Sequence, residues 1–123
     1  MKKANILIGD DEEGVRETLK HMLDDEYALS YAADGAEAVE QVAAHDPDVV
    51  VMDIKMPKMN GLEALRKIKE LKPGIRVVII TGYESTDVAT EAINLGADDY
   101  ITKPFRQQKI RTQIRTLLDS KGS

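Results

Sequence analysis

The sequence has no cysteine, no apolar run near the ~20 residues that span a bilayer, and no excess of positive charge. Without cysteine, disulfides and thiolate-bound metals are excluded. The formal net charge of −5 argues against direct binding to nucleic acid, which normally needs a basic face. Acidic residues interrupt the apolar start too early for a signal peptide. We therefore expect a cytoplasmic protein with no direct membrane or nucleic-acid contact.

The chain is short enough for one folded unit. It has 123 residues, of which 42% are hydrophobic, and it shows no internal repeat or low-complexity tract. We expect one domain over residues 1–119, followed by a polar tail or linker stump at 120–123.

Short apolar runs predict a mostly buried sheet. Residues 6–8, 49–52 and 77–80 are continuous and rich in Val and Ile, and 99–101 is a weaker run. Such runs are typical of parallel strands covered on both faces. Residues 27–31 alternate in size, which favours a half-exposed edge strand.

Amphipathic segments lie between these runs and predict helices. Asp34, Asn60 and Ser85 each occupy a position suited to capping the helix that follows. The alternation predicts an α/β fold, (βα)5, with a doubly wound, five-stranded parallel sheet. With the half-exposed second strand at an edge, the expected strand order is 2-1-3-4-5.

Polar residues follow four of the predicted strands, and so gather at one edge of the sheet. Asp10 and Asp11 follow the first strand, Asp53 the third, Thr81 the fourth and Lys103 the fifth. In doubly wound sheets, ligands bind at this carboxyl edge where the strand order reverses. The reversal lies between the first and third strands, so the three aspartates are expected to meet there.

Three such carboxylates need a compensating charge. Like charges ~4 Å apart repel by roughly 4 kcal/mol at an effective dielectric near 20. Oxygen-only ligands favour a hard cation, and Mg²⁺ suits this set better than Ca²⁺. Asp53, at the end of the central strand, is the best candidate for a carboxylate nucleophile, with Asp10 and Asp11 as metal ligands. Lys103 adds a cation and Thr81 a hydroxyl donor, as phosphoryl transfer requires.

Simpler interpretations exist for single residues. Glu12 and Glu13 are interpreted as acids that favour a helix N-terminus. The basic residues of the last helix, Arg111 and Arg115 among them, are interpreted as a solvated face. Only the joint placement of the five polar residues resists such explanations.

The sequence resembles the receiver domains of two-component response regulators over essentially its whole length. That resemblance implies a flavodoxin-like fold of the receiver type. It rests on an ordered set of motifs: Asp10-Asp11, Asp53-Ile54-Lys55-Met56-Pro57, Gly61, Thr81-Gly82, Tyr100 and Lys103-Pro104-Phe105.

The resemblance implies that Asp53 accepts a phosphoryl group from a phosphohistidine. Mg²⁺ would be bound directly by Asp11, Asp53 and the backbone carbonyl of Lys55, and by Asp10 mainly through water. Lys103 would contact the phosphoryl oxygens, and its bond to Pro104 is expected to be cis.

Further roles follow from the same resemblance. Thr81 and the backbone N–H of Gly82 would bind the phosphoryl oxygens, and Thr81 would act with Tyr100 as a switch. The surface formed by the fourth helix, fifth strand and fifth helix would then change. Lys55 and Tyr83 are expected to slow self-dephosphorylation by limiting access of water.

The implied activity is that of a stoichiometric switch rather than of a turnover enzyme. Its partners would be a sensor histidine kinase or histidine phosphotransfer protein and an unidentified output, with homodimerisation on phosphorylation left open. A phosphatase would need a second carboxylate at position 55, where Lys55 stands. A flavin or nucleotide module would need a phosphate-binding loop where the sequence has Gly9-Asp10-Asp11-Glu12. A degenerate receiver is disfavoured because every expected site residue is present.

Overall fold

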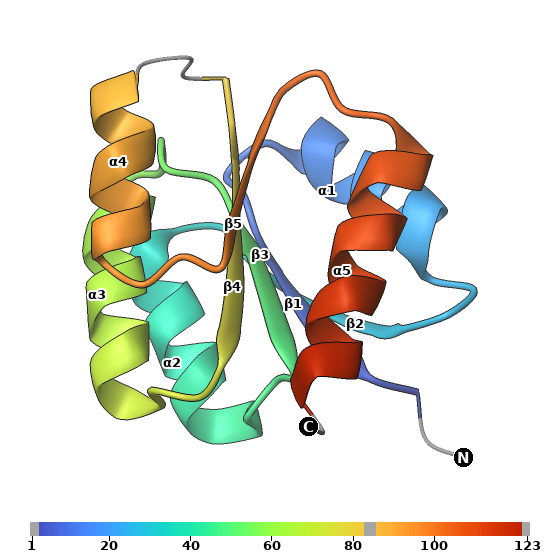
Figure 1. Cartoon of the computed structure of the whole chain (residues 1–123), viewed down its shortest axis with the longest axis horizontal. Coiled ribbons are helices and arrows are strands. Elements are labelled where there is room, and N and C mark those ends of the chain that lie inside the picture. The colour runs from blue at the N-terminus through green and yellow to red at the C-terminus, as the bar shows by residue number, and fades with distance from the viewer. Residues whose placement is uncertain (1–2, 83–85, 122–123) are drawn as a thin grey trace.

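A computed structural model describes residues 3–82 and 86–121 of the chain. Strands and helices alternate throughout, as predicted (Figure 1). The strands are β1 (Asn5–Gly9), β2 (Ala28–Ala32), β3 (Val49–Met52), β4 (Arg76–Thr81) and β5 (Asp99–Thr102). The helices are α1 (Glu13–Leu23), α2 (Gly35–His45), α3 (Gly61–Leu71), α4 (Thr86–Asn94) and α5 (Gln107–Lys121).

The five strands form one parallel sheet in the order β2-β1-β3-β4-β5, which confirms the predicted order. β3 is buried along its whole length, whereas most of β2 is half-buried at the sheet edge. Because β1 and β3 are neighbours, the loops that follow them leave the sheet side by side.

Helices cover both faces of the sheet (Figure 1), with α2, α3 and α4 on one side and α1 and α5 on the other. Successive strand residues point to opposite faces. Leu7 therefore packs in the core beneath α2 and α3, while Ile6 and Ile8 pack in the core beneath α1 and α5. The same alternation along β3 and β4 gives each face a continuous apolar layer.

Two of the predicted helix caps are present. The Asp34 carboxylate accepts a hydrogen bond from the Glu37 N–H at 2.8 Å, and Asn60 Oδ1 accepts one from the Glu63 N–H at 3.0 Å. Each satisfies a backbone donor that the first helical turn leaves unpaired. Ser85, the third predicted cap, lies outside the described residues.

The last helix differs from the prediction on its basic side. α5 ends at Lys121, and no glycine or proline interrupts 107–121. Its basic side is not wholly solvated, since Arg111 and Arg115 form ion pairs with Glu26, which follows α1. Those pairs join α5 to the end of α1 across 85 or more residues of chain.

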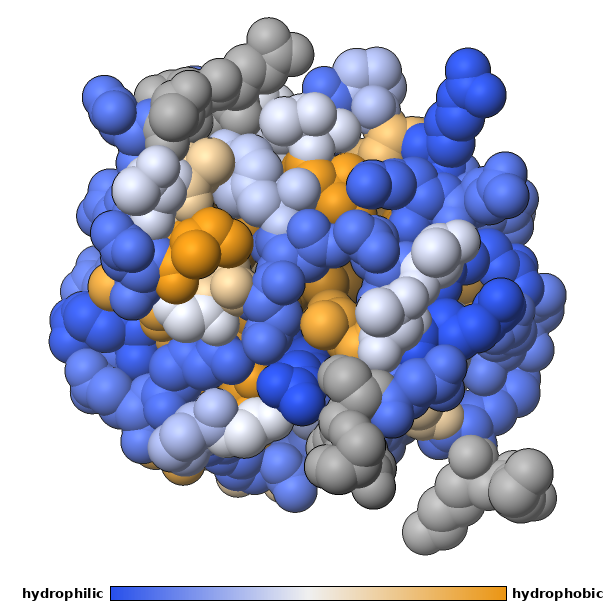
Figure 2. Space-filling model, viewed as in Figure 1, coloured by the Kyte–Doolittle hydropathy of each residue, from blue (hydrophilic) through white to orange (hydrophobic). Residues whose placement is uncertain are grey.

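The face of the molecule seen in Figure 2 is mostly hydrophilic and carries only small, separate hydrophobic patches. Within the described part of the chain, no helix combines the length and apolar composition needed to cross a bilayer.

Candidate phosphorylation site

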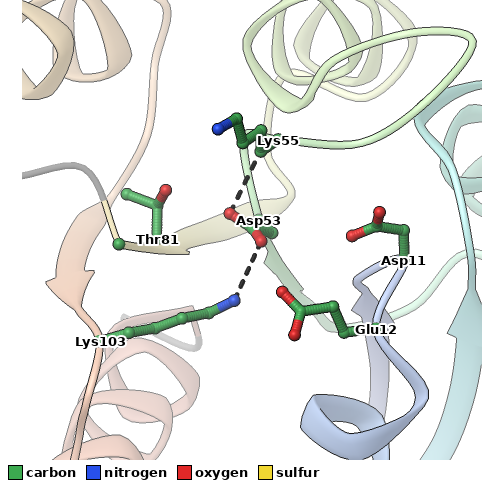
Figure 3. A pocket seen from close by; sticks show the side chains of 7 residues that line it. Asp11, Glu12, Asp53, Lys55, Thr81 and Lys103 are labelled. Carbon is green, nitrogen blue, oxygen red and sulfur yellow. Dashed lines mark hydrogen bonds and ion pairs between the residues drawn. The ribbon is translucent and has the colours of Figure 1, made fainter.

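A cavity of about 370 Å³ opens at the carboxyl edge of the sheet (Figure 3). It lies where the loops after β1, β3, β4 and β5 converge, so its position follows from the strand order. Residues from all four loops line it: Asp11, Glu12, Asp53, Lys55, Thr81, Gly82 and Lys103. The predicted convergence of distant polar residues is therefore confirmed.

Asp53 directly follows the buried strand β3 and is 5% exposed. Its backbone N–H donates to the Gly9 carbonyl at 2.8 Å, which ties it to the end of β1. Its carboxylate Oδ1 accepts the Ile54 N–H at 2.7 Å. The backbone thus fixes one carboxylate oxygen, and the other faces Lys103 across the cavity.

Lys103 follows β5, and its backbone N–H donates to the Thr81 carbonyl at 2.8 Å. Its Nζ lies 3.0 Å from a carboxylate oxygen of Asp10 and 3.0 Å from Asp53 Oδ2. Burial opposes the charge of Lys103, but hydrogen bonds and attraction from Asp53 and Asp10 outweigh it, so the lysine pKa is raised. Lys103 therefore stays charged, and its bond to Pro104 is cis, as expected.

Three consecutive acids after β1 form the acidic wall of the site. Asp10, Asp11 and Glu12 each offer a carboxylate oxygen, and these oxygens lie within 4.8 Å of one another. Asp10 is buried, whereas Asp11 and Glu12 are exposed toward the cavity. Burial, followed by the nearby charge of Asp53, raises the pKa of Asp10, although the Glu12 N–H and Lys103 lower it in part.

The cavity wall on the β4 side is small and polar. Thr81 is 1% exposed and lines the cavity with Gly82, where an added Cβ would meet no atom within 4 Å among the described residues. Tyr100 in β5 is half-buried against the core, and burial together with the charge of Asp53 raises its pKa. The negative charge of Asp53 therefore acts on the hydroxyl of Tyr100 in β5.

The chain is similar in sequence to known proteins. The family model of the response regulator receiver domain matches residues 6–115. The response regulator MprA of Mycobacterium ulcerans (strain Agy99) is 35% identical over 116 residues, which is 94% of this chain and 50% of that protein. The chain belongs to the receiver-domain family of response regulators.

Solved structures agree with this receiver fold. A CheY-like response regulator receiver domain protein from Methanospirillum hungatei JF-1 is 31% identical, with a TM-score of 0.94 and 98% of both chains covered. The CheX–CheY–BeF3–Mg+2 complex from Borrelia burgdorferi gives 29% identity and a TM-score of 0.91, covering 94% of this chain and 90% of that one. The receiver domain spans about half the length of the curated relatives it matches.

The receiver site is chemically suited to a hard divalent cation. Its acidic donors are all oxygens, and neither histidine lies among them. Several carboxylates close together either take up protons or bind a cation that allows them to be ionised together. Membership of this family also implies a kinase or phosphotransfer partner.

The prediction from sequence left out one residue of the receiver site. Glu12 was interpreted only as a helix-terminal acid, yet its side chain lines the cavity beside Asp11. Its position immediately after Asp10 and Asp11, at the same sheet edge, is the signal that could have found it. Tyr83, expected to affect phosphoryl lifetime, lies outside the described residues, while its predicted companion Lys55 is exposed at the cavity.

Proposed function

We propose that Asp53 accepts a phosphoryl group from a phosphohistidine on a sensor histidine kinase or histidine phosphotransfer protein. The observation that carries this proposal is the Asp53 carboxylate, buried beneath an open cavity with a lysine ammonium 3.0 Å away. A fixed cation at this position offsets the negative charge that accumulates during transfer.

The transfer step balances as a displacement at phosphorus. One Asp53 carboxylate oxygen bonds to phosphorus while the bond from phosphorus to the donor's imidazole nitrogen breaks. The electron pair of that bond remains on the imidazole nitrogen, which takes up a proton from solvent. Self-dephosphorylation is hydrolysis of the aspartyl phosphate: water attacks phosphorus and gives up a proton to solvent, the bond from phosphorus to the Asp53 oxygen breaks, and inorganic phosphate and the Asp53 carboxylate are released.

The residues around Asp53 divide the remaining work. Asp11, Asp53 and the backbone carbonyl of Lys55 would hold Mg²⁺ directly, with Asp10 acting mainly through water. When bound, the ion neutralises charge between the acids and the phosphoryl oxygens. Lys103, Thr81 and the Gly82 N–H would contact the phosphoryl oxygens after transfer.

The response to phosphorylation would start at Thr81. The new group adds roughly −1.5 to −2 charges and strong acceptor oxygens. The Thr81 hydroxyl would move toward them and Tyr100 would rotate inward, which changes the surface formed by α4, β5 and α5. A preference of a few kcal/mol for one conformation suffices for such a switch.

The proposed activity is stoichiometric: each chain carries at most one phosphoryl group at a time and acts as a switch rather than as a turnover enzyme for a small substrate. Lys55 and Tyr83 would slow the loss of that group by restricting water. We propose a receiver domain over residues 1–119, so that the end of α5 begins the polar tail or linker stump at 120–123. The output partner stays unidentified, homodimerisation on phosphorylation is a further proposal, and cytoplasmic location stays a prediction.

Intact mass measured after incubation with Mg²⁺ and acetyl phosphate tests the proposal. We expect one added phosphoryl group on the wild-type chain and none on Asp53→Asn, which keeps the side-chain size but removes the nucleophile. Omission of Mg²⁺ should prevent the addition. Phosphorylation that persists in Asp53→Asn, or multiple turnover of a small phosphoester, would contradict the assignment.

A further inference from the structure

The loop over residues 54–60 leaves Asp53 and carries Lys55 past the cavity (Figure 3). Two glycines touch this loop through their backbones. The Gly61 N–H donates to the Ile54 carbonyl at 2.7 Å, and the Gly35 N–H donates to the Met59 carbonyl at 3.1 Å. Gly61 closes the loop on itself, whereas Gly35 holds it from a separate element, the first turn of α2.

Both contacts exclude a side chain on the glycine. A Cβ on Gly35 would lie 2.0 Å from the Met59 carbonyl oxygen, and a Cβ on Gly61 would lie 2.0 Å from the Asp53 carbonyl oxygen. Such atoms essentially never approach within 3.0 Å, and here the obstructing atoms are backbone. Any residue larger than glycine at position 35 must therefore move the loop or α2.

Hydrogen bonds and an ion pair fix the start of α2, on the other side of this contact. Asp34 caps the helix through the Glu37 N–H, and Glu37 in turn accepts the Ala33 N–H at 3.2 Å. Asp34 also lies 3.7 Å from the ammonium of Lys58, a loop residue held at a φ of 66°. The start of α2 therefore meets the loop through both a hydrogen bond and an ion pair.

We propose that Gly35 is a positioning residue for the phosphorylation site. It sets how closely the 54–60 loop packs against α2, and through that loop it sets the position of the Lys55 backbone beside Asp53. The inference rests on the proposed function, because it assigns Gly35 an effect on the Mg²⁺ site. Gly35 itself touches neither the ion nor the phosphoryl group.

Calorimetric titration of Mg²⁺ into Gly35→Ala tests this role, with Gly14→Ala as the matched control. Both glycines lie in the first turn of a helix, but a Cβ on Gly14 would have no neighbour within 4 Å in the part of the chain that the structure describes. We expect Gly35→Ala to weaken Mg²⁺ binding by about tenfold or more, because substitution of residues that position metal ligands typically has an effect of this size. Gly14→Ala should bind Mg²⁺ as the wild type does. Wild-type Mg²⁺ affinity in folded Gly35→Ala, as judged by thermal unfolding, would overturn the proposal.

Amide hydrogen exchange on the wild-type chain provides a second test that does not depend on the variant folding. If the Gly35 contact favours Mg²⁺ binding, Mg²⁺ must equally favour the contact, because coupling is reciprocal. Because Mg²⁺ binding stabilises the whole domain, we expect it to slow exchange of the Gly35 N–H by a larger factor than that of the Asp98 N–H, which donates to the Val77 carbonyl at the opposite edge of the sheet. Exchange at Gly35 that is slowed no more than exchange at Asp98 would overturn the inference.

Different results would overturn the proposed function and the role of Gly35. A wild-type chain that neither binds Mg²⁺ nor takes up a phosphoryl group would overturn the proposed function, and this inference with it. A wild-type chain that does both, alongside a Gly35→Ala variant with unchanged affinity, would overturn only the role of Gly35.

Discussion

Asp10 is an acid of the site whose burial opposes its charge. It is 2% exposed, and burial is the main cause of its raised pKa. The N–H of Glu12 and the ammonium of Lys103 compensate only partly. The metal-free domain therefore loses stability whenever Asp10 ionises.

Replacing Asp10 with Asn should reveal that cost as a function of pH. Because the folded-state pKa exceeds the ordinary value of 3.8, the contribution of Asp10 to stability is full below that value and is lost as pH rises through the raised pKa. Asp10→Asn should gain stability relative to the wild type, by about 0.5–2 kcal/mol, as pH rises from 3.8 through the raised pKa. Urea unfolding without Mg²⁺ measures the difference.

A stability difference that stays constant over this range, or that shrinks as pH rises, would show that burial of the Asp10 charge costs nothing. The same variant should bind Mg²⁺ more weakly. A gain in stability with a loss of binding is the expected trade-off for a residue retained for function.

At the scale of elements, Asp98 joins α3, β4 and the start of β5. Its carboxylate accepts the Val77 N–H at 2.8 Å and the Lys69 ammonium at 3.1 Å. Arg76 lies 3.6 Å away, and the Lys69 side chain is only 17% exposed. This cluster lies at the amino end of β5, away from the cavity, so its role is to hold elements together.

Asp98→Asn should therefore cost far more than the same change at Asp46. Asp98→Asn leaves the poorly solvated Lys69 without its carboxylate, and breaking such a pair costs about 2 kcal/mol or more. Asp46 pairs with Lys72 but is 75% exposed, so Asp46→Asn should cost less than about 1 kcal/mol. Urea unfolding of both variants gives the comparison, and equal costs would contradict the structural role of Asp98.

The strands were predictable because apolar periodicity reports which side chains are buried. Their ends were less so: the second strand was expected at 27–31 but spans Ala28–Ala32. Tyr27 is buried against the α1 and α5 core without belonging to the strand. Burial and backbone pairing are separate properties, and a sequence pattern detects only burial.

The position of the site was likewise predictable only in part. Parallel strands of known order bring Asp53 and Lys103 to one edge, so their meeting could be predicted from topology. Glu12 could have been included by the same reasoning, because it follows Asp10 and Asp11 at that edge. The Gly35 contact could not be predicted, because it depends on how closely two backbones approach. Sequence pattern predicts the edge at which side chains gather, and packing decides which backbone atoms then touch.

At the scale of the whole molecule, folding and the site depend on each other. The acids, Lys103 and Thr81 lie at the ends of four strands, up to 93 residues apart in the chain, and only the folded sheet brings them together. An unfolded chain therefore lacks the Mg²⁺ site. Binding to the folded state alone must stabilise the whole domain by mass action.

We accordingly expect the free energy of unfolding to rise with Mg²⁺ concentration, approaching about 1.4 kcal/mol per tenfold increase once the site is saturated. Asp11→Asn should abolish most of this rise. Because Asp11 is exposed, the substitution should change metal-free stability by less than about 0.5 kcal/mol. Urea unfolding at constant ionic strength, balanced with NaCl to remove general screening, measures both chains. An equal Mg²⁺ response in both would mean that the ion acts elsewhere on the surface, because a site built by Asp11 cannot survive its removal unchanged.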